Sequence, residues 1–168
     1  MTEISAFNKL SESEAASVVE HWCAAKSWVR GVVAGRPFAS ISALSQSCAD
    51  VWATMEEADL LEAYAAHPRI GDVDLLKRKY ADTARAEQGQ VAQADEGVIT
   101  QLAELNIAYH KKFGFIFIVF ASGKSAEEML SMLVTRIENS REDELANAAA
   151  EQEKIFQNRL DQYFAQAH

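Results

Sequence analysis

Proline and glycine, the residues that build tight turns, are scarce in this sequence. Two prolines and seven glycines among 168 residues are too few for the many short turns of a β-sandwich or β-barrel. The apolar fraction of 49% is that of a folded globular chain and argues against disorder. Two separate cores would each need about 100 residues, so we expect a single domain over residues 1–168.

Basic residues are also few. Sixteen Lys and Arg stand against 25 Asp and Glu, which gives a net charge of −9. Binding to a nucleic-acid backbone needs clustered basic residues, so no nucleic-acid partner is expected. The longest unbroken apolar run, 115–121, is far shorter than the ~20 residues that span a bilayer, and no membrane partner is expected either.

Cysteine and histidine are too sparse to suggest a metal site. The spacing of Cys23 and Cys48 matches no metal or redox motif, and two buried free thiols in a reducing compartment are favoured over one disulfide. The four histidines lie far apart, none with a second His or Cys at helical spacing, and we predict no metal. Residues 1–10 lack the basic and apolar regions of a secretory leader, so we expect a cytoplasmic protein.

Apolar residues recur at steps of three and four over most of the chain, which predicts amphipathic helices. Capping boxes, in which a serine and a glutamate three residues later satisfy each other's backbone amides, predict helix starts at Ser11 and Ser125. The first of these helices is expected to continue to Gly31 and Gly35. Others are expected after Ser42, over about 57–67, from Asp95 to a left-handed stop at Gly114, and from Ser140 or Asp143 onward, with helix pieces and loop over 69–93.

One stretch does not follow the helical pattern. Residues 113–122 form an apolar run rich in β-branched and aromatic side chains, which predicts a buried extended segment. The sequence offers no second strand to pair with it. We therefore predict an all-α fold, a single-domain helical bundle with one extended apolar segment threaded through it.

His67 closes an apolar helix, because Pro68 disfavours helical geometry in the residue before it. A charged turn that contains a glycine, Arg69–Asp72, follows. A histidine here can exchange protons near neutral pH, and the helix C-terminus favours its charged form. The alternative is a capping histidine that bonds the last helical carbonyls.

Two further polar positions are candidates when taken with His67. Glu87 lies in an alanine-flanked stretch, where a solvated loop is the default, but it could orient the imidazole or complete an acid–base pair. Arg159 lies between Phe156 and Tyr163 at helical spacing. It either pairs with a surface carboxylate or binds an anion such as a substrate carboxylate.

Other motifs are interpreted structurally. Ser122–Ser125 ends like a phosphate-binding loop, but Ile118 occupies the position where that loop needs a glycine, so a polar turn before a helix cap is favoured. The acidic residues Asp59, Glu62 and those of 138–144 are expected to lie on solvated helix faces or to be charges in helix cap regions.

Several of these blocks together resemble the OHCU decarboxylases, enzymes of uric acid catabolism. The resemblance rests on Ala66–Asp72, Glu87–Gln88, Phe113–Phe115 with the apolar run to Ala121, and Arg136–Asn139 before the last helix. The spacing between the blocks also fits, and the resemblance covers nearly the whole chain.

The resemblance implies an all-helical, cofactor-free and usually homodimeric carboxy-lyase. It would convert 2-oxo-4-hydroxy-4-carboxy-5-ureidoimidazoline (OHCU) to (S)-allantoin and CO2. It implies a catalytic histidine at His67, assisted by Glu87. Substrate contacts would come from Pro68, Ala84, Arg85, Ala86, Glu87, Gln88, Arg159 and the backbone around Phe117, Ile118, Val119, Phe120 and Ala121.

The sequence departs from the family at one point and leaves alternatives open. Family members often carry serines where this chain has Ala84 and Ala86, so any hydroxyl contact from those positions is absent. A related enzyme acting on another ureide is one alternative. The other is a helical interaction module without catalysis, supported by the potential exposure of Trp28, Phe38 and the long C-terminal helix.

Overall fold

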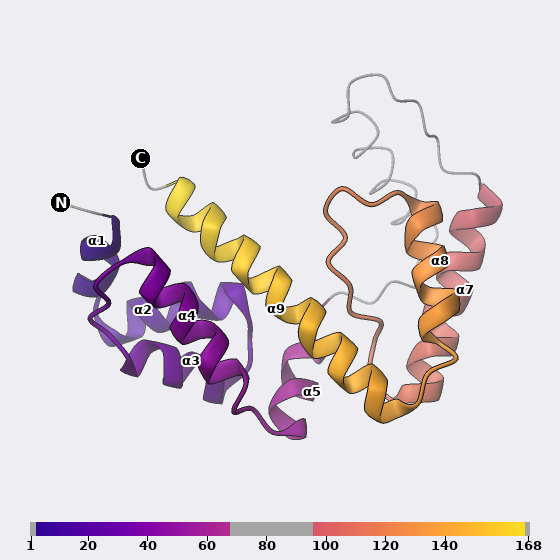
Figure 1. Ribbon diagram of the computed structural model, residues 1–168, viewed down its shortest axis with the longest axis horizontal. Coiled ribbons are helices and arrows are strands. Elements are labelled where there is room, and N and C mark those ends of the chain that lie inside the picture. The colour runs from indigo at the N-terminus through magenta and orange to yellow at the C-terminus, as the bar shows by residue number, and fades with distance from the viewer. Residues whose placement is uncertain (1–2, 68–95, 167–168) are drawn as a thin grey trace, which may run out of the picture. The chain divides into compact units, whose positions relative to one another are not determined.

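The computed structural model describes residues 3–67 and 96–166, and within these ranges the chain is helical (Figure 1). No strand occurs among these residues, and the predicted all-α fold is confirmed. The helices are α1 (Glu3–Lys9), α2 (Glu12–Trp22), α3 (Lys26–Ala34), α4 (Ile41–Trp52), α5 (Glu57–Ala65), α7 (Glu96–Phe113), α8 (Ala126–Arg136) and α9 (Arg141–Ala165). None of them is long and apolar enough to cross a membrane.

Three of the predicted helix starts are confirmed, and in each the capping group lies close in the sequence, whereas the helix predicted after Ser42 begins two residues earlier, capped by Ser40. Ser11 Oγ accepts a hydrogen bond from the Glu14 amide at 3.1 Å, and Glu14 Oε1 accepts one from the Ser11 amide at 3.0 Å. Ser125 Oγ accepts from the Glu128 amide at 3.1 Å. Ser140 Oγ accepts from the Asp143 amide at 3.1 Å, so α9 begins at the first of its two predicted positions.

The first long helix that we predicted is in fact two helices. The chain is extended at Cys23 (φ −160°, ψ 128°), between α2 and α3. Ala25, at the start of α3, has no capping side chain of its own. The amide of Lys26 instead donates to Glu62 Oε1 of α5 at 2.8 Å. A cap from so distant a residue leaves no local signal, and helix α1 was also not predicted.

Contacts divide the chain into two compact units. The first, unit 1, comprises Met1–Ala66 and Ala149–His168. The second, unit 2, comprises His67–Ala148, so helix α9 contributes residues to both. The prediction of a single domain is not tested by this division and stays a prediction.

Aromatic side chains form the core of unit 1. The rings of Trp28 and Phe156 lie 4.8 Å apart, and the ring of Trp52 lies 5.8 Å from that of Phe156. Trp28 is 0% exposed and Phe38 is 9% exposed. Both are core residues, which removes the support that they lent to an interaction module.

The two cysteines are buried in unit 1 and free, as predicted. Burial raises the pKa of Cys23 to about 11 and that of Cys48 to about 12. Both thiols are therefore protonated at neutral pH, and neither has the character of a reactive thiolate.

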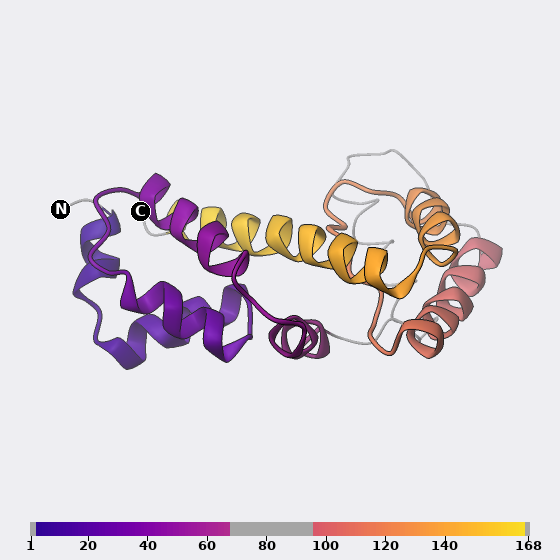
Figure 2. The same ribbon diagram turned by 60° about the horizontal axis from the view of Figure 1, so that its bottom comes forward.

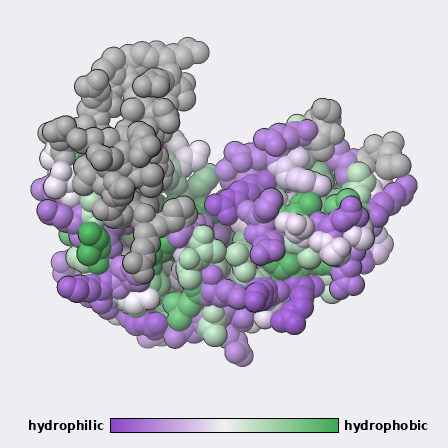
Figure 3. Space-filling model, turned by 180° about the vertical axis from the view of Figure 1, so that it is seen from behind, coloured by the Kyte–Doolittle hydropathy of each residue, from purple (hydrophilic) through white to green (hydrophobic). Residues whose placement is uncertain are grey.

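In unit 2, helices α7 and α8 lie side by side (Figures 1 and 2). The non-helical segment that joins them, residues 114–125, belongs to the same unit. Gly114 ends α7 with φ +84°, the left-handed conformation predicted for it. The core of the unit includes Leu102, Tyr109, Phe113, Phe117, Met129 and Leu133. On the face shown in Figure 3, hydrophilic residues predominate over the described surface, with hydrophobic residues scattered among them.

Candidate functional site

His67 follows directly on the end of α5. Helix α5 buries Ala63 and Tyr64, and Ala66 closes it, with its amide directed to the carbonyls of those two residues. His67 itself is half-buried. The predicted end of the helix at or near this histidine is confirmed. Packing of the last turn of α5 fixes the position from which the His67 backbone continues.

Several predicted site residues lie outside the described residues. They are Pro68, Ala84, Arg85, Ala86, Glu87 and Gln88. The pairing of His67 with Glu87 therefore stays a prediction, as does the contribution of the 84–88 backbone to substrate binding.

The segment Phe117–Ala121 lies between α7 and α8 and is non-helical, as predicted. Phe117, Ile118 and Val119 are buried, with exposed fractions of 3%, 2% and 8%. Among the residues that the structure describes, their backbone N–H groups have no hydrogen-bond acceptor. Buried amides without a partner are rare because they forfeit the hydrogen bond that water would supply. This stretch therefore offers donors to a polar ligand.

Carbonyl groups of the same segment are bonded by cationic side chains. Arg136 Nη1 donates to the Ile118 carbonyl at 2.7 Å, and Lys124 Nζ donates to the Phe120 carbonyl at 2.7 Å. Lys124 is part of the polar turn before α8, which confirms the structural interpretation of the Ser122–Ser125 motif. Both cations can only donate, so they hold the segment through its acceptors and leave the N–H groups of 117–119 unused.

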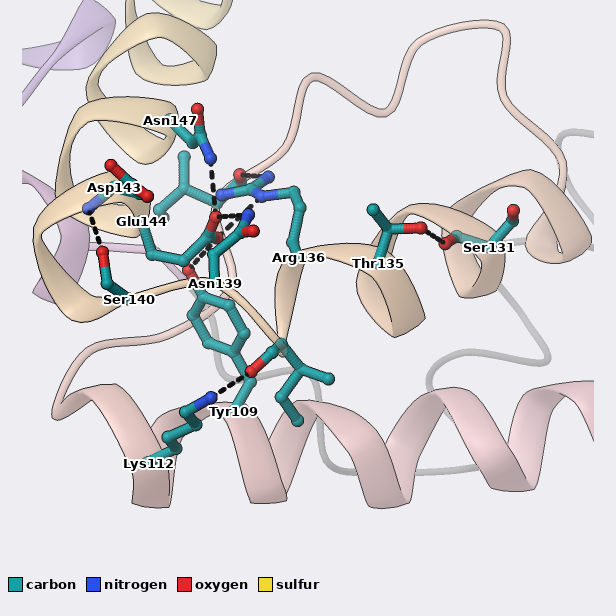
Figure 4. Close-up of polar contacts among 12 residues, drawn as sticks. Tyr109, Lys112, Ser131, Thr135, Arg136, Asn139, Ser140, Asp143, Glu144 and Asn147 are labelled. Atoms are coloured by element: carbon teal, nitrogen blue, oxygen red, sulfur yellow. Dashed lines mark hydrogen bonds and ion pairs between the residues drawn. The ribbon is translucent and has the colours of Figure 1, made fainter.

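Arg136 belongs to a polar cluster centred on the buried carboxylate of Glu144 (Figure 4). Glu144 Oε1 accepts from Arg136 Nε at 2.8 Å and from the Tyr109 hydroxyl at 2.6 Å. Glu144 Oε2 accepts from Asn139 Nδ2 at 2.9 Å and from Asn147 Nδ2 at 2.6 Å. These five residues, called the Glu144 cluster below, join α7, α8 and the start of α9.

The cluster sets the charge states of its members. Burial acts to raise the pKa of Glu144, but hydrogen bonds from Asn139, Tyr109 and Asn147 and the charge of Arg136 outweigh it, so the pKa lies below its ordinary value. Burial, together with the bond to Glu144, raises the pKa of Tyr109 well above its ordinary value. The cluster is thus a carboxylate held by a neutral phenol, two amides and one guanidinium.

Sequence analysis missed this cluster. Of the two alternatives that we gave for Glu144, a position in a helix cap region is confirmed, because it lies in the first turn of α9, but a solvated side chain is wrong, since it is 0% exposed. A signal was present, because Met129, Leu133 and Arg136 follow helical spacing on one face, which places the arginine on the buried side. Asp59, by contrast, accepts from the Glu56 amide at 3.1 Å and caps α5, as expected of it.

Arg159 lies on α9 in unit 1 and is half-buried. Its Nη1 donates to the carbonyls of His21 and Trp22, at 3.3 and 3.2 Å, where α2 ends. Cations favour the C-terminal end of a helix, so this guanidinium has a structural contact that we did not predict. Its binding of a substrate carboxylate stays a prediction.

Groups of three or more His, Cys, Asp or Glu side chains arranged to hold a metal ion do not occur among the described residues. Among the described residues of unit 2, unused donors are offered by the backbone amides of 117–119, in a segment that Lys124 and Arg136 hold by its carbonyls. Such an arrangement is suited to holding a polar or anionic organic ligand by hydrogen bonds.

Comparison with known proteins gives this arrangement a context. The model of a family described as OHCU decarboxylase matches residues 8–161. The uric acid degradation bifunctional protein TTL of Arabidopsis thaliana is 35% identical over 147 residues, which are 85% of this chain and 45% of that protein. The 2-oxo-4-hydroxy-4-carboxy-5-ureidoimidazoline decarboxylase of Amia calva is 31% identical over 131 residues, 77% of this chain and 75% of that protein. The chain thus spans less than half the length of the bifunctional relative.

A solved structure resembles the chain in sequence and fold. It is the crystal structure of OHCU decarboxylase in the presence of (S)-allantoin, which is 33% identical with a TM-score of 0.71. The match covers 87% of this chain and 96% of that one.

Proposed function

The chain belongs to the OHCU decarboxylase family, and we propose that it converts OHCU to (S)-allantoin and CO2 in uric acid catabolism. The observation that carries the proposal is the family match over residues 8–161, nearly the whole chain. The similarity to an OHCU decarboxylase solved in the presence of (S)-allantoin supports the choice of substrate. The buried, unpartnered amides of 117–119 support it as well, because an imidazolone with a ureido group carries oxygen acceptors for them.

The chemistry of the substrate explains why we propose a reaction without a cofactor. The departing carboxylate sits on a carbon that bears a hydroxyl and adjoins a C=N bond. When the bond to CO2 breaks, its electron pair moves into that C=N, so the substrate supplies the electron sink that pyridoxal or thiamine provides elsewhere. The protein then has to bind an anion, orient its carboxylate and manage protons.

In this proposal His67 is the catalytic residue. Its imidazole takes the proton of the substrate hydroxyl or stabilises the negative charge that develops there, and Glu87 fixes the orientation of the ring. Acid–base help of this kind is typically worth about 10²–10⁴ in rate. The half-buried position of His67, at the end of a well-packed helix, supports the assignment because it limits the motion of the ring.

Substrate orientation is assigned to the backbone of Phe117–Ala121. Amides fixed in a buried segment set the orientation of a flat polar ring that they bind, and they do not need to be reoriented when the ligand arrives. The cationic anchors at Ile118 and Phe120 support this assignment, because they immobilise the segment without occupying its donors. Side-chain hydroxyls at positions 84 and 86 are not part of the proposal, since alanines stand there.

We also propose a homodimer in the cytoplasm. The buried free thiols of Cys23 and Cys48 support a reducing compartment. The dimer follows from family membership, and light scattering of the purified protein would test it.

The test of function uses freshly generated OHCU and follows both CO2 release and the optical activity of the allantoin formed. Wild-type protein is expected to accelerate CO2 release and to yield the (S) enantiomer. His67→Asn is expected to lose at least about 100-fold in rate while keeping its helical circular dichroism. His110→Asn is the matched control, since it changes another half-buried histidine near a helix end, and it is expected to leave the rate unchanged.

Three results would contradict the proposal in different ways. No acceleration by the wild type would refute the activity. Acceleration with another ureide alone, in a panel of such compounds, would reassign the substrate. Full activity of His67→Asn would remove this histidine from the mechanism.

A further inference from the structure

Arg136 is buried at the end of α8, an unusual place for a charged side chain. It is 8% exposed, and its partner Glu144 is 0% exposed. Taking two charges out of water is costly even when they pair, and apolar side chains of the same volume would often serve stability as well. A pair that stability alone does not require calls for another role.

The contacts of Arg136 point to the segment that follows α7. Its Nη1 donates to the carbonyl of Ile118 at 2.7 Å, and its guanidinium lies 4.6 Å from the ring centre of Phe117. Two consecutive residues are therefore held by one planar group, one through its backbone and the other through its ring. Because the guanidinium is planar and rigid, these contacts fix the orientation of the backbone as well as its position.

Glu144 holds that guanidinium in place. The two oxygens of its carboxylate accept hydrogen bonds from Arg136, Tyr109, Asn139 and Asn147 (Figure 4). A carboxylate with four donors cannot rotate without losing several of them. The position of the Ile118 carbonyl is thus tied, through Arg136 and Glu144, to three helices.

We propose that Arg136 is a positioning residue for the reaction: it fixes the backbone of Phe117–Val119 so that the amides of this stretch stay available to the substrate. The inference rests on the proposed function, because it needs the substrate bound to these amides. An arginine suits the role because it has only donors. A paired strand would hold the segment equally well but would take up the same N–H groups.

Three variants separate this role from general stabilisation. Arg136→Lys keeps the charge but not the planar fork that reaches Glu144 and Ile118 together. The double variant Arg136→Met/Glu144→Gln removes both charges, so that no unpaired buried charge threatens folding. Arg141→Lys is the matched control, since Arg141 makes the same two kinds of contact outside Phe117–Val119, with the Phe113 carbonyl at 3.1 Å and the Phe115 ring at 5.8 Å.

The first measurement is steady-state decarboxylation of OHCU, together with the dissociation constant of (S)-allantoin. A misplacement of about 1 Å can cost about 100-fold in rate. We therefore expect both Arg136 variants to lose about 10- to 100-fold in kcat/KM, with KM and the (S)-allantoin dissociation constant raised. Arg141→Lys is expected to match the wild type. Unchanged KM and (S)-allantoin binding in the folded Arg136 variants would overturn the proposal.

The second measurement is hydrogen exchange of peptides that cover 117–121, which does not depend on activity. Exchange there is expected to be faster in both Arg136 variants than in the wild type and Arg141→Lys. Exchange as slow as in the wild type would overturn the positioning role, whether or not the protein decarboxylates OHCU. An inactive wild type with the expected exchange pattern would refute the proposed function and, with it, the substrate on these amides, while leaving the anchoring of the segment established.

Discussion

The Glu144 cluster can be tested by removing one atom, the hydroxyl oxygen of Tyr109, with Tyr109→Phe. The hydroxyl donates to Glu144 Oε1 at 2.6 Å, while the ring lies 4.5 Å from Phe113 and 5.3 Å from Phe117. Phenylalanine keeps those ring contacts and removes only the donor. A hydrogen bond to a charged group contributes about 1.5–3 kcal/mol, and for a chain of this size each kcal/mol shifts the melting temperature by about 2–4 °C. We therefore expect the melting temperature to fall by about 3–12 °C.

Urea unfolding followed by circular dichroism measures the change in the free energy of unfolding directly. Tyr163→Phe is the control, because the Tyr163 ring packs 5.7 Å from Trp22 while its hydroxyl has no hydrogen bond among the described residues. The control is expected to lose less than about 0.5 kcal/mol, as most substitutions away from such contacts do. A loss in Tyr109→Phe no larger than in the control would refute the view that this hydroxyl stabilises the buried carboxylate.

Further predictions concern pH, the thiols and Arg159. Because the pKa of Glu144 is lowered in the folded protein, its ionised carboxylate stabilises the fold above the ordinary pKa of 4.5, and this stabilisation is lost as the pH falls through the folded pKa. The difference in free energy of unfolding between wild type and Glu144→Gln, measured by urea unfolding, is therefore expected to become smaller in acid. A difference that stays constant with pH would contradict this. Because the pKa values of Cys23 and Cys48 are raised to about 11 and about 12, a thiol reagent at neutral pH is expected to label neither cysteine until the protein unfolds. Rapid labelling of the native protein would show that the thiols are accessible. Arg159→Met is expected to raise KM for OHCU at least about tenfold if its guanidinium binds the substrate carboxylate, whereas a lower melting temperature at unchanged KM would assign it to the end of α2 alone.

Local signals account for the parts of the fold that were predicted. The caps at Ser11 and Ser125 bond amides three residues away, so the sequence contains both partners within one turn. Gly114 stops α7 because a left-handed residue is needed there. The extended run was predicted by its aromatic and β-branched composition. In each case the physical cause lies within a few residues of the effect.

Long-range contacts account for the parts that were missed. The start of α3 is capped by Glu62, which a search for caps within the first turn cannot find. Glu144 was expected on a solvated helix face or in a helix cap region, and its burial was missed because its neighbours in space are donors from three helices. A charged residue is buried or exposed according to whether such partners are assembled around it, and that assembly is a property of the tertiary structure.

The candidate site was predicted only in part, for a similar reason. His67 stood out because a proline, a helix end and a charged turn meet there. The role of the 117–121 backbone came from the resemblance to a family, since a backbone amide carries no sequence signature. Arg136 drew no attention as a site residue, because its importance depends on the Ile118 carbonyl that it contacts, 18 residues away.

The helical fold itself explains why a buried non-helical segment can serve as a binding surface. Within a helix, every backbone N–H beyond the first turn is bonded to a carbonyl four residues earlier and is unavailable to a ligand. A helical protein can therefore offer buried backbone donors only at helix starts or where the chain leaves the helix, as it does between Gly114 and Ser125. Such a stretch lacks the ladder of bonds that would hold a strand in place, so other groups have to fix it. Arg136 and Lys124, which can only donate, satisfy the carbonyls of Ile118 and Phe120 and leave the amides of 117–119 free, and for this reason the cations that anchor the segment and the amides that we assign to the substrate occur together.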